Sequence, residues 1–266
     1  MTKFAERYGP WAVVAGASEG IGAAFARALA GRGTDLILVA RRPEPLAALA
    51  ESLPVRTVTV AADLATAEGL ASVFAATAEL EVGLVVANAA YWPSGLFIEA
   101  ADDDLQRIID LNCRAPLRLA RHYLPSMAAR RRGGLIVMSS ASGLQGNPFL
   151  SAYGASKAFG AVLAEGLWWE LRGSGVDVTA CVAGAVSTPG LAANGRRPAP
   201  GTVAPDAVAA AALAGLGRGP RVVPGALMRV STALMARLFP RKSAIDLMAR
   251  ATKAALPADN DVAGPP

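Results

Sequence analysis

The chain has 266 residues, of which 53% are hydrophobic and 18% charged, and its formal net charge is +5. This composition excludes a disordered chain and allows one large α/β domain or two small ones. With one histidine, two cysteines and no C-x-x-C spacing, a zinc site or a disulfide scaffold is excluded as well, so we expect no metal.

Short apolar runs alternate with helical stretches along most of the chain. Strands are expected at residues 11–16, 35–40, 55–61, 84–87, 135–139, 176–182 and 221–223. Helices are expected at residues 20–32, 44–53, 65–78, 103–112, 115–131, 152–172 and 205–216. Continuous apolar strands separated by helices are typical of a parallel sheet that is covered on both faces. We therefore predict a Rossmann-type, doubly wound α/β fold of about seven strands.

No linker divides the chain, so residues 1–266 are predicted to form a single domain. Its core is expected at about 10–225, a helical extension at 226–256 and a flexible tail at 257–266. Segment 184–205 is rich in proline and glycine and follows the sixth strand, at the edge where such sheets bind ligands. We favour a mobile substrate lid there over a plain surface loop.

The chain shows neither a targeting segment nor a membrane span. Residues 1–10 are polar, and no apolar run reaches the roughly 20 residues that cross a bilayer. We therefore expect a cytoplasmic protein. The densest basic run, Arg130-Arg131-Arg132, is typical of a solvated helix end, and no nucleic-acid binding is expected because no basic stripe is visible.

A glycine-rich turn follows the first strand and opens the first helix. Glycines let the backbone approach a pyrophosphate closely, and a helix N-terminus offers free N–H donors. The spacing is G-x-x-x-G-x-G, which in this position predicts a dinucleotide site. The expected contacts are Gly16, Ser18, Glu19, Gly20, Ile21 and Gly22.

The end of the second strand bears on the choice of cofactor. Ala40 stands where a carboxylate would hold a ribose 2′-hydroxyl, and Arg41 and Arg42 follow it. Guanidinium groups suit a 2′-phosphate, so NADP(H) is predicted over NAD(H), the alternative being a solvated strand end. Further cofactor contacts are expected at the ends of the third and fourth strands, from Asp63, Leu64, Asn88 and Ala89.

Tyr153 and Lys157 lie four residues apart, and Ser140 precedes Tyr153 by thirteen residues. On a helix, positions i and i+4 share a face, so a phenol and an ammonium are expected side by side. The positive charge is expected to lower the tyrosine pKa from about 10, which would make the phenol a general acid and base near neutral pH.

Seven features occur in the order and spacing of the short-chain dehydrogenases/reductases. They are the Gly16 turn, Asp63, Asn88, Asn112, Ser140, Tyr153 and Lys157. The chain resembles this family over about residues 11–188. It departs from the family pattern at Ala15, Ala87, Ala90 and Ala183. The strand end at residues 38–42 and the Arg/Leu-rich tail are similar to bacterial reductases of the steroid and long-chain acyl reductase branch.

The resemblance implies a role for each catalytic residue. Tyr153 would be the acid/base, Lys157 would lower its pKa and bind the nicotinamide ribose, and Ser140 would hydrogen-bond the substrate carbonyl. Asn112 would hold a water in a proton relay. The resemblance further implies nicotinamide and phosphate contacts and a homodimer or homotetramer formed through the helices at 115–131 and 152–172. The residues expected at the nicotinamide are Val186 and Thr188.

Apolar side chains after the fourth and fifth strands and in the lid are candidates for contacts with a bulky, apolar substrate. They are Tyr91, Trp92, Phe97, Leu144, Phe149, Leu150 and Leu191. His122, Cys113 and the pair Trp168-Trp169 are interpreted as packing or surface residues.

The tail at residues 227–256 interleaves leucine and methionine with arginine and lysine. It would close the substrate pocket, join subunits or lie on a membrane, and the packed alternatives are favoured over the membrane.

The predicted function is an NADP-dependent carbonyl reductase or alcohol dehydrogenase acting on a small molecule. The alternatives are a catalytically silent dinucleotide-binding regulator and a membrane-associated lipid-pathway reductase. The four filled catalytic positions favour the enzyme.

Overall fold

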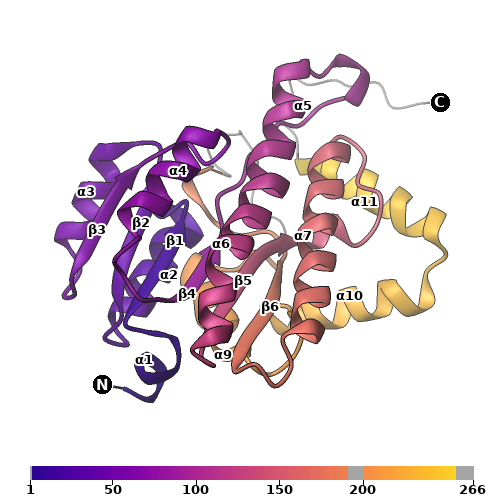
Figure 1. The fold of residues 1–266 in the computed structure, drawn as a ribbon. Coiled ribbons are helices and arrows are strands. Elements are labelled where there is room, and N and C mark those ends of the chain that lie inside the picture. The colour runs from indigo at the N-terminus through magenta and orange to yellow at the C-terminus, as the bar shows by residue number, and fades with distance from the viewer. Residues whose placement is uncertain (1, 191–200, 256–266) are drawn as a thin grey trace.

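The computed structural model describes residues 2–190 and 201–255. A parallel seven-stranded sheet, in the order β3-β2-β1-β4-β5-β6-β7, runs through the domain (Figure 1). The strands are β1 (Trp11–Ala15), β2 (Asp35–Ala40), β3 (Thr57–Ala61), β4 (Val82–Ala87), β5 (Gly133–Ser140), β6 (Val176–Ala183) and β7 (Arg221–Val222). The prediction of a Rossmann-type doubly wound single domain is confirmed.

The helices follow the predicted alternation. They are α1 (Lys3–Tyr8), α2 (Gly20–Ala30), α3 (Pro43–Glu51), α4 (Ala67–Ala76), α5 (Asp102–Ile109), α6 (Ala115–Ala129), α7 (Ser151–Glu170), α9 (Pro205–Gly215), α10 (Ala226–Leu238) and α11 (Arg241–Ala255). Two short 3-10 helices, η1 (Phe97–Glu99) and η3 (Ala141–Gly143), and one π-helix, η2 (Asp110–Arg114), complete the set of described helices.

Each face of the sheet carries its own hydrophobic core. Ala12 and Val14 of β1 pack in the core that α2, α3 and α9 cover, whereas Val13 and Ala15 pack in the core that α4, α6 and α7 cover. Successive side chains of a strand point to opposite faces, so continuous apolar strands supply both cores. Full burial of one valine, leucine or isoleucine side chain of these strands contributes about 1.5–3 kcal/mol to the free energy of folding.

The strand order places a ligand crevice at the centre of the sheet. From β1 the chain first builds outward through β2 to β3, and it then crosses back to β4 on the other side of β1. In open α/β sheets, ligands bind at the carboxyl ends of the strands where the order reverses in this way. The turn after β1 and the N-terminus of α2 therefore lie at the expected ligand edge.

Two parts of the fold differ from the predicted elements, and the predicted helical tail divides into two helices. Helix α1 was not predicted, because six residues are too few to show a helical period. It is connected to β6 by the hydroxyl of Tyr8, which donates a hydrogen bond to Asp177 at 2.6 Å. The helix predicted at 103–112 ends at Ile109 and continues as the π-helix η2. The tail forms two helices, α10 and α11, which lie beyond the β6 side of the sheet (Figure 1).

The two ends of the predicted lid are fixed to each other by main-chain hydrogen bonds. Ser187 N donates to Val203 O at 3.0 Å, and Val203 N donates to Ala185 O at 3.0 Å. Residues 191–200 of that segment, which include Leu191, and the tail 257–266 lie outside the described residues. Within the described part of the chain, no helix has both the length and the apolar character needed to cross a bilayer.

Candidate active site

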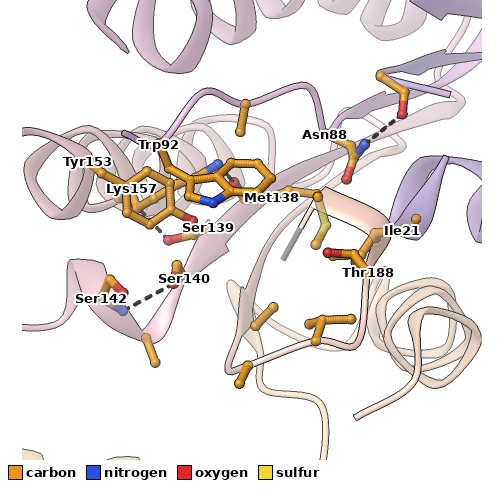
Figure 2. Close-up of a pocket in the computed structure, with 18 of the residues that line it drawn as sticks. Ile21, Asn88, Trp92, Met138, Ser139, Ser140, Ser142, Tyr153, Lys157 and Thr188 are labelled. Atoms are coloured by element: carbon orange, nitrogen blue, oxygen red, sulfur yellow. Dashed lines mark hydrogen bonds between the residues drawn. The ribbon is translucent and has the colours of Figure 1, made fainter. Parts of the chain in front are cut away.

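One cavity of about 780 Å³ brings most of the predicted site residues together. Of the predicted cofactor and catalytic residues, those that line it are Gly16, Ser18, Glu19, Gly20, Ile21, Arg41, Arg42, Asp63, Leu64, Asn88, Ala89, Ser140, Tyr153, Lys157, Val186 and Thr188. Figure 2 shows Tyr153, Lys157 and Ser140 on one side of this cavity and Asn88, Ile21 and Thr188 on the other.

The glycines of the turn after β1 are required by close approaches of the backbone. Gly16 has φ +72°, and a Cβ there would lie 2.9 Å from Ala89 Cα. A Cβ on Gly22 would lie 1.9 Å from Gly16 O, so Gly22 packs beneath the turn rather than lining the cavity. The side-chain amide of Asn88 donates to Ala15 O and Gly16 O at 3.0 and 3.2 Å, which fixes the turn to the end of β4.

The two arginines after β2 have different surroundings. Arg42 forms a 2.6 Å ion pair with Glu19 of the glycine-rich turn. Arg41 lines the cavity, is exposed, and forms neither an ion pair nor a hydrogen bond with any described residue. Arg41 is therefore a cation whose guanidinium remains available to an anionic ligand, whereas Arg42 is already paired.

Asp63, at the end of the β3 segment, is held by Arg107. Its Oδ2 accepts from Arg107 Nη2 at 2.6 Å, and its Oδ1 accepts from Ala65 N at 3.0 Å. Partial burial raises the pKa of Asp63, but the hydrogen bonds from Arg107 and Ala65 lower it more, so the net pKa lies below its ordinary value. Sequence reasoning did not identify Arg107, which lies on α5, 44 residues from Asp63.

Lys157 is buried on α7 beside Tyr153. Its Nζ donates to Met138 O at 2.9 Å and lies 5.6 Å from the centre of the Tyr153 ring. Burial lowers the pKa of Lys157 to about 8, and the neighbouring Cys113 partly opposes this shift. An ammonium has three N–H donors, so the bond to Met138 leaves two for other partners. Trp92 also lies beside the phenol, with ring centres 6.3 Å apart.

Ser140 lies at the end of β5 and caps the 3-10 helix η3. Its Oγ accepts a hydrogen bond from Ser142 N at 3.2 Å. Because that bond uses a lone pair of the oxygen, the O–H remains able to donate. Ser140 and Tyr153 line the same cavity, so two hydroxyl groups lie at one ligand site.

Asn112 lies on the π-helix η2, outside the cavity lining. Its Oδ1 accepts from Tyr91 N at 2.8 Å, and its Nδ2 donates to Tyr91 O at 2.8 Å and to Ser156 Oγ at 3.0 Å. Asn112 therefore connects the segment after β4 to α7, three residues from Tyr153. The side chain holds protein groups on both sides, and the water-holding role implied by the resemblance stays a prediction.

The predicted substrate contacts divide into two groups. Trp92, Leu144 and Leu150 line the cavity. Tyr91, Phe97 and Phe149 do not: the Tyr91 hydroxyl donates to Asp104 at 2.6 Å, and Phe149 is buried with φ +63°. The hydrogen bonds between Asn112 and the Tyr91 backbone fix that segment so that the neighbouring Trp92, and not Tyr91, reaches the cavity.

The residues interpreted as packing or surface residues lie in such positions. His122 stacks on Phe74 with ring centres 3.9 Å apart, and Cys113 is a buried free thiol whose pKa is raised by burial. Arg172 lies over the Trp168 ring at 4.3 Å, while Trp169 is exposed.

Helices α10 and α11 cover the remaining side of the cavity. The described lining residues that they contribute are Met228, Ser231, Thr232, Met235, Met248, Ala251, Thr252 and Ala255. Sequence reasoning did not assign these residues to the site, although it kept pocket closure as one use of the tail. A flexible thioether fills irregular space well, so the methionines make an apolar and adaptable wall.

A buried hydrogen bond fixes α11 to the loop before α7. Thr252 Oγ1 donates to Asn147 Oδ1 at 2.8 Å, and both side chains are buried. Asn147 O in turn accepts from Leu150 N at 3.1 Å, next to the start of the helix that carries Tyr153. Arg241 Nη1 adds a longer bond to Leu144 O at 3.4 Å. The covering helices are thus connected directly to the segment that precedes the Tyr153 helix.

The doubly wound sheet, the glycine-rich turn and the Ser140, Tyr153 and Lys157 side chains at one cavity define a Rossmann-type oxidoreductase. The short chain dehydrogenase family model matches residues 10–198. The chain therefore belongs to the short-chain dehydrogenase family and is an oxidoreductase of that family.

Individual relatives agree with this assignment. The chain is 35% identical over 193 residues to a 7beta-hydroxysteroid dehydrogenase of Collinsella aerofaciens, which covers 71% of this chain and 73% of that protein. A solved structure of a 7beta-hydroxysteroid dehydrogenase superposes with a TM-score of 0.87 at 30% identity, covering 93% of this chain and 99% of that one. A short-chain dehydrogenase from Sphingobium yanoikuyae in complex with NADPH has a TM-score of 0.75 at 32% identity, covering 86% and 96%.

Proposed function

We propose that this protein is an NADP(H)-dependent oxidoreductase that interconverts a ketone and a secondary alcohol on a bulky, largely apolar substrate, with Tyr153 as the general acid and base. The observation that carries the proposal is the shared cavity. The glycine-rich turn and Arg41, the hydroxyls of Ser140 and Tyr153, and the methionines of α10 and α11 all line it.

The residues present fit a phosphorylated dinucleotide. Gly16 and Gly20 have positive φ values and keep side chains away from the turn, where the N-terminus of α2, which its N-cap residue Glu19 does not cap through its side chain, offers N–H donors and positive potential. Arg41 has no ion-pair partner among the described residues and its guanidinium suits a 2′-phosphate, and the NADPH complex of a structural relative supports this choice. Lys157 would hold the nicotinamide ribose through its free N–H groups. The bound cofactor supplies or accepts the hydride at the carbonyl carbon.

The protein residues act on the oxygen of the substrate. During reduction, negative charge grows on the carbonyl oxygen, and Ser140 and Tyr153 donate hydrogen bonds to it. Tyr153 then transfers its proton to that oxygen, which completes the alcohol and leaves a phenolate. The Lys157 ammonium stabilises the phenolate, since opposite charges attract strongly at a buried site. Oxidation of the alcohol reverses each step.

The substrate is proposed to be large and apolar. Trp92, Leu144, Leu150 and the methionines of α10 and α11 make the wall apolar, and the 7beta-hydroxysteroid dehydrogenase relatives support a polycyclic alcohol or ketone.

We further propose that the enzyme forms a homo-oligomer through α6 and α7. A groove between these helices is lined by leucine side chains, among them Leu117, Leu124 and Leu167. Large apolar side chains nearby are exposed, including Val162 and Trp169 on α7. An exposed apolar patch of this kind marks an interaction surface.

The test is turnover of a panel of ketones and alcohols with NADPH, NADH and their oxidised forms. We expect the purified protein to reduce bulky polycyclic ketones faster than small ones, and to use NADPH in preference to NADH. Tight NADPH binding without turnover of any carbonyl or alcohol would favour the catalytically silent regulator instead.

A further inference from the structure

The excess of basic over acidic side chains in this protein is concentrated in two helices. The chain has 26 basic and 21 acidic side chains, and α10 with α11 holds six basic and one acidic residue, which leaves 20 of each elsewhere. The six basic residues are Arg229, Arg237, Arg241, Lys242, Arg250 and Lys253, and the acidic one is Asp246. All seven are exposed, and none forms an ion pair with a described residue. The formal net charge of +5 therefore resides entirely on α10 and α11.

The same helices expose a row of large apolar side chains. Leu227, Val230, Leu234 and Leu238 of α10 are between 47% and 69% exposed. Their spacing of three and four residues places them in one line along the helix. Phe239, directly after α10, and Leu247 of α11 are also exposed, so the apolar character continues beyond α10.

This exposed row is not the face that lines the cavity. Met228, Ser231, Thr232 and Met235 of α10 line the cavity, and they also follow helical spacing. Helix α10 therefore turns Met228 and Met235 to the cavity and a second, largely exposed apolar row away from it, of which Leu227 lies against Gly201. An exposed apolar row on a helix that also carries exposed basic side chains is typical of a helix that lies in a membrane interface.

We propose that the outer face of α10 and α11 docks onto the surface of an anionic lipid bilayer, with the Leu227–Leu238 row inserted among the acyl chains. The six exposed basic side chains of the same two helices match the negative charge of such a surface, which attracts each nearby Lys or Arg. A second copy of the chain is a poorer occupant, because a two-fold contact through this face would place like charges against each other.

This orientation has a consequence for the cavity below. The helices that would touch the lipid are the same ones that cover the cavity, with the lipid on one face of α10 and the cavity lining on the other. An apolar substrate dissolved in the bilayer would reach the cavity without first entering bulk water. The docking itself does not depend on the proposed reaction, because it requires neither cofactor nor turnover.

The experiment is vesicle co-sedimentation of the full-length protein in the absence of cofactor. We expect binding to vesicles of phosphatidylglycerol mixed with phosphatidylcholine, weaker binding as the salt concentration rises, and little binding to phosphatidylcholine alone. The variant R229E/R237E should reduce the partition coefficient more than about tenfold. The matched control K3E/R218E changes two exposed basic residues outside α10 and α11 that form no ion pair with a described residue, and it should bind as the wild type does.

A second pair of variants isolates the apolar contribution. Leu238→Ser should weaken binding roughly threefold at unchanged charge, whereas Ile98→Ser, at an even more exposed apolar position, should leave it unchanged. Thermal unfolding shows that each variant is folded. Equal losses in R229E/R237E and K3E/R218E would overturn the proposal, and so would absence of binding to anionic vesicles. It would also be overturned if L238S altered only the sedimentation coefficient of the lipid-free protein, since the face would then belong to a second copy.

Discussion

Two sides of one cavity are built in different ways. The floor, formed by the glycine-rich turn, Arg41, Ser140, Tyr153 and Lys157, comes from the ends of strands and from α7. The roof, formed by α10 and α11, comes from the end of the described chain. Floor residues are fixed by side-chain hydrogen bonds to the main chain, such as that from Lys157 Nζ to Met138 O at 2.9 Å. The roof is fixed by a few long-range contacts, of which Thr252 with Asn147 is buried.

The difference indicates that the two sides have different roles, the floor in the chemical step and the roof in substrate binding. Chemistry on a carbonyl oxygen needs donors held within a narrow geometry, which the strand ends and the buried Lys157 of the floor provide. Selection of a bulky apolar substrate needs an adaptable surface, and the methionines of the roof provide one. Changes in the floor should therefore reduce turnover, whereas changes in the roof should alter substrate affinity and stability.

Tyr153→Phe tests the floor most severely. Removal of the hydroxyl abolishes the proton donor, and we expect kcat to fall by about 10²–10⁴-fold while NADPH affinity stays within a few-fold. Stopped-flow or steady-state NADPH oxidation measures this loss. The matched control is Tyr123→Phe, which removes a buried hydroxyl that bonds Thr77 at 2.9 Å outside the cavity. Near-normal turnover in Tyr153→Phe would show that the floor does not contain the acid.

Lys157→Met should reduce kcat by about 10²-fold and should also change how stability depends on pH. The pKa of Lys157 is about 8 in the folded protein against 10.5 ordinarily, so between these values only the unfolded state holds the proton. The free energy of unfolding of the wild type should therefore rise with pH across that window, and the variant should lose this rise. Urea titrations on both sides of pH 8 measure it. The control variant Lys253→Met, at an exposed position, should keep the rise in the free energy of unfolding with pH. The same pH dependence of stability in the wild type and in Lys157→Met would contradict the account.

Arg41→Ala should lower the preference for NADPH over NADH by about 10- to 100-fold, since a charge-assisted hydrogen bond contributes roughly 1.5–3 kcal/mol. Arg42→Ala is the matched control. Arg42 is paired with Glu19 at 2.6 Å, so its loss should change the preference less. The ratio of kcat/KM values for the two cofactors measures both effects. An equal or larger effect at Arg42 would reverse the assignment.

Thr252→Val tests the roof. The variant leaves the buried Asn147 oxygen without its donor, which should lower the free energy of unfolding by about 1–3 kcal/mol. It should also raise KM for a bulky ketone while leaving kcat for a small ketone near the wild-type value. Thr77→Val removes a comparable buried hydroxyl on the far side of α6 and should lower stability without changing KM. An unchanged KM for the bulky ketone in Thr252→Val would show that the roof does not contribute to substrate binding.

The same division explains how much could be predicted from the sequence. Tyr153 and Lys157 share a helix face through a spacing of four, and Gly16 follows a strand directly, so short-range patterns were sufficient to bring them to one sheet edge. The roof is set by contacts across 105 residues between Thr252 and Asn147, and no local pattern encodes such a pairing.

Local departures from regular structure account for the other differences. The π-helix η2 adds a residue to a turn and thereby directs Asn112 toward Tyr91 and Ser156, which a regular helical period cannot show. Phe149 has φ +63° and is buried, while its neighbour Leu150 lines the cavity. Which of two adjacent apolar residues faces a ligand depends on such backbone angles, and the residue types alone do not determine them.

The most direct test of the central claim is deuterium transfer to a bulky ketone from NADPH that carries deuterium at both C4 positions of the nicotinamide. Mass spectrometry of the alcohol product should show one deuterium on the carbinol carbon with the wild type. Under the same conditions Tyr153→Phe should bind NADPH and form almost no product. An unlabelled alcohol, or labelled product at the wild-type rate from Tyr153→Phe, would contradict a hydride transfer completed by the Tyr153 proton.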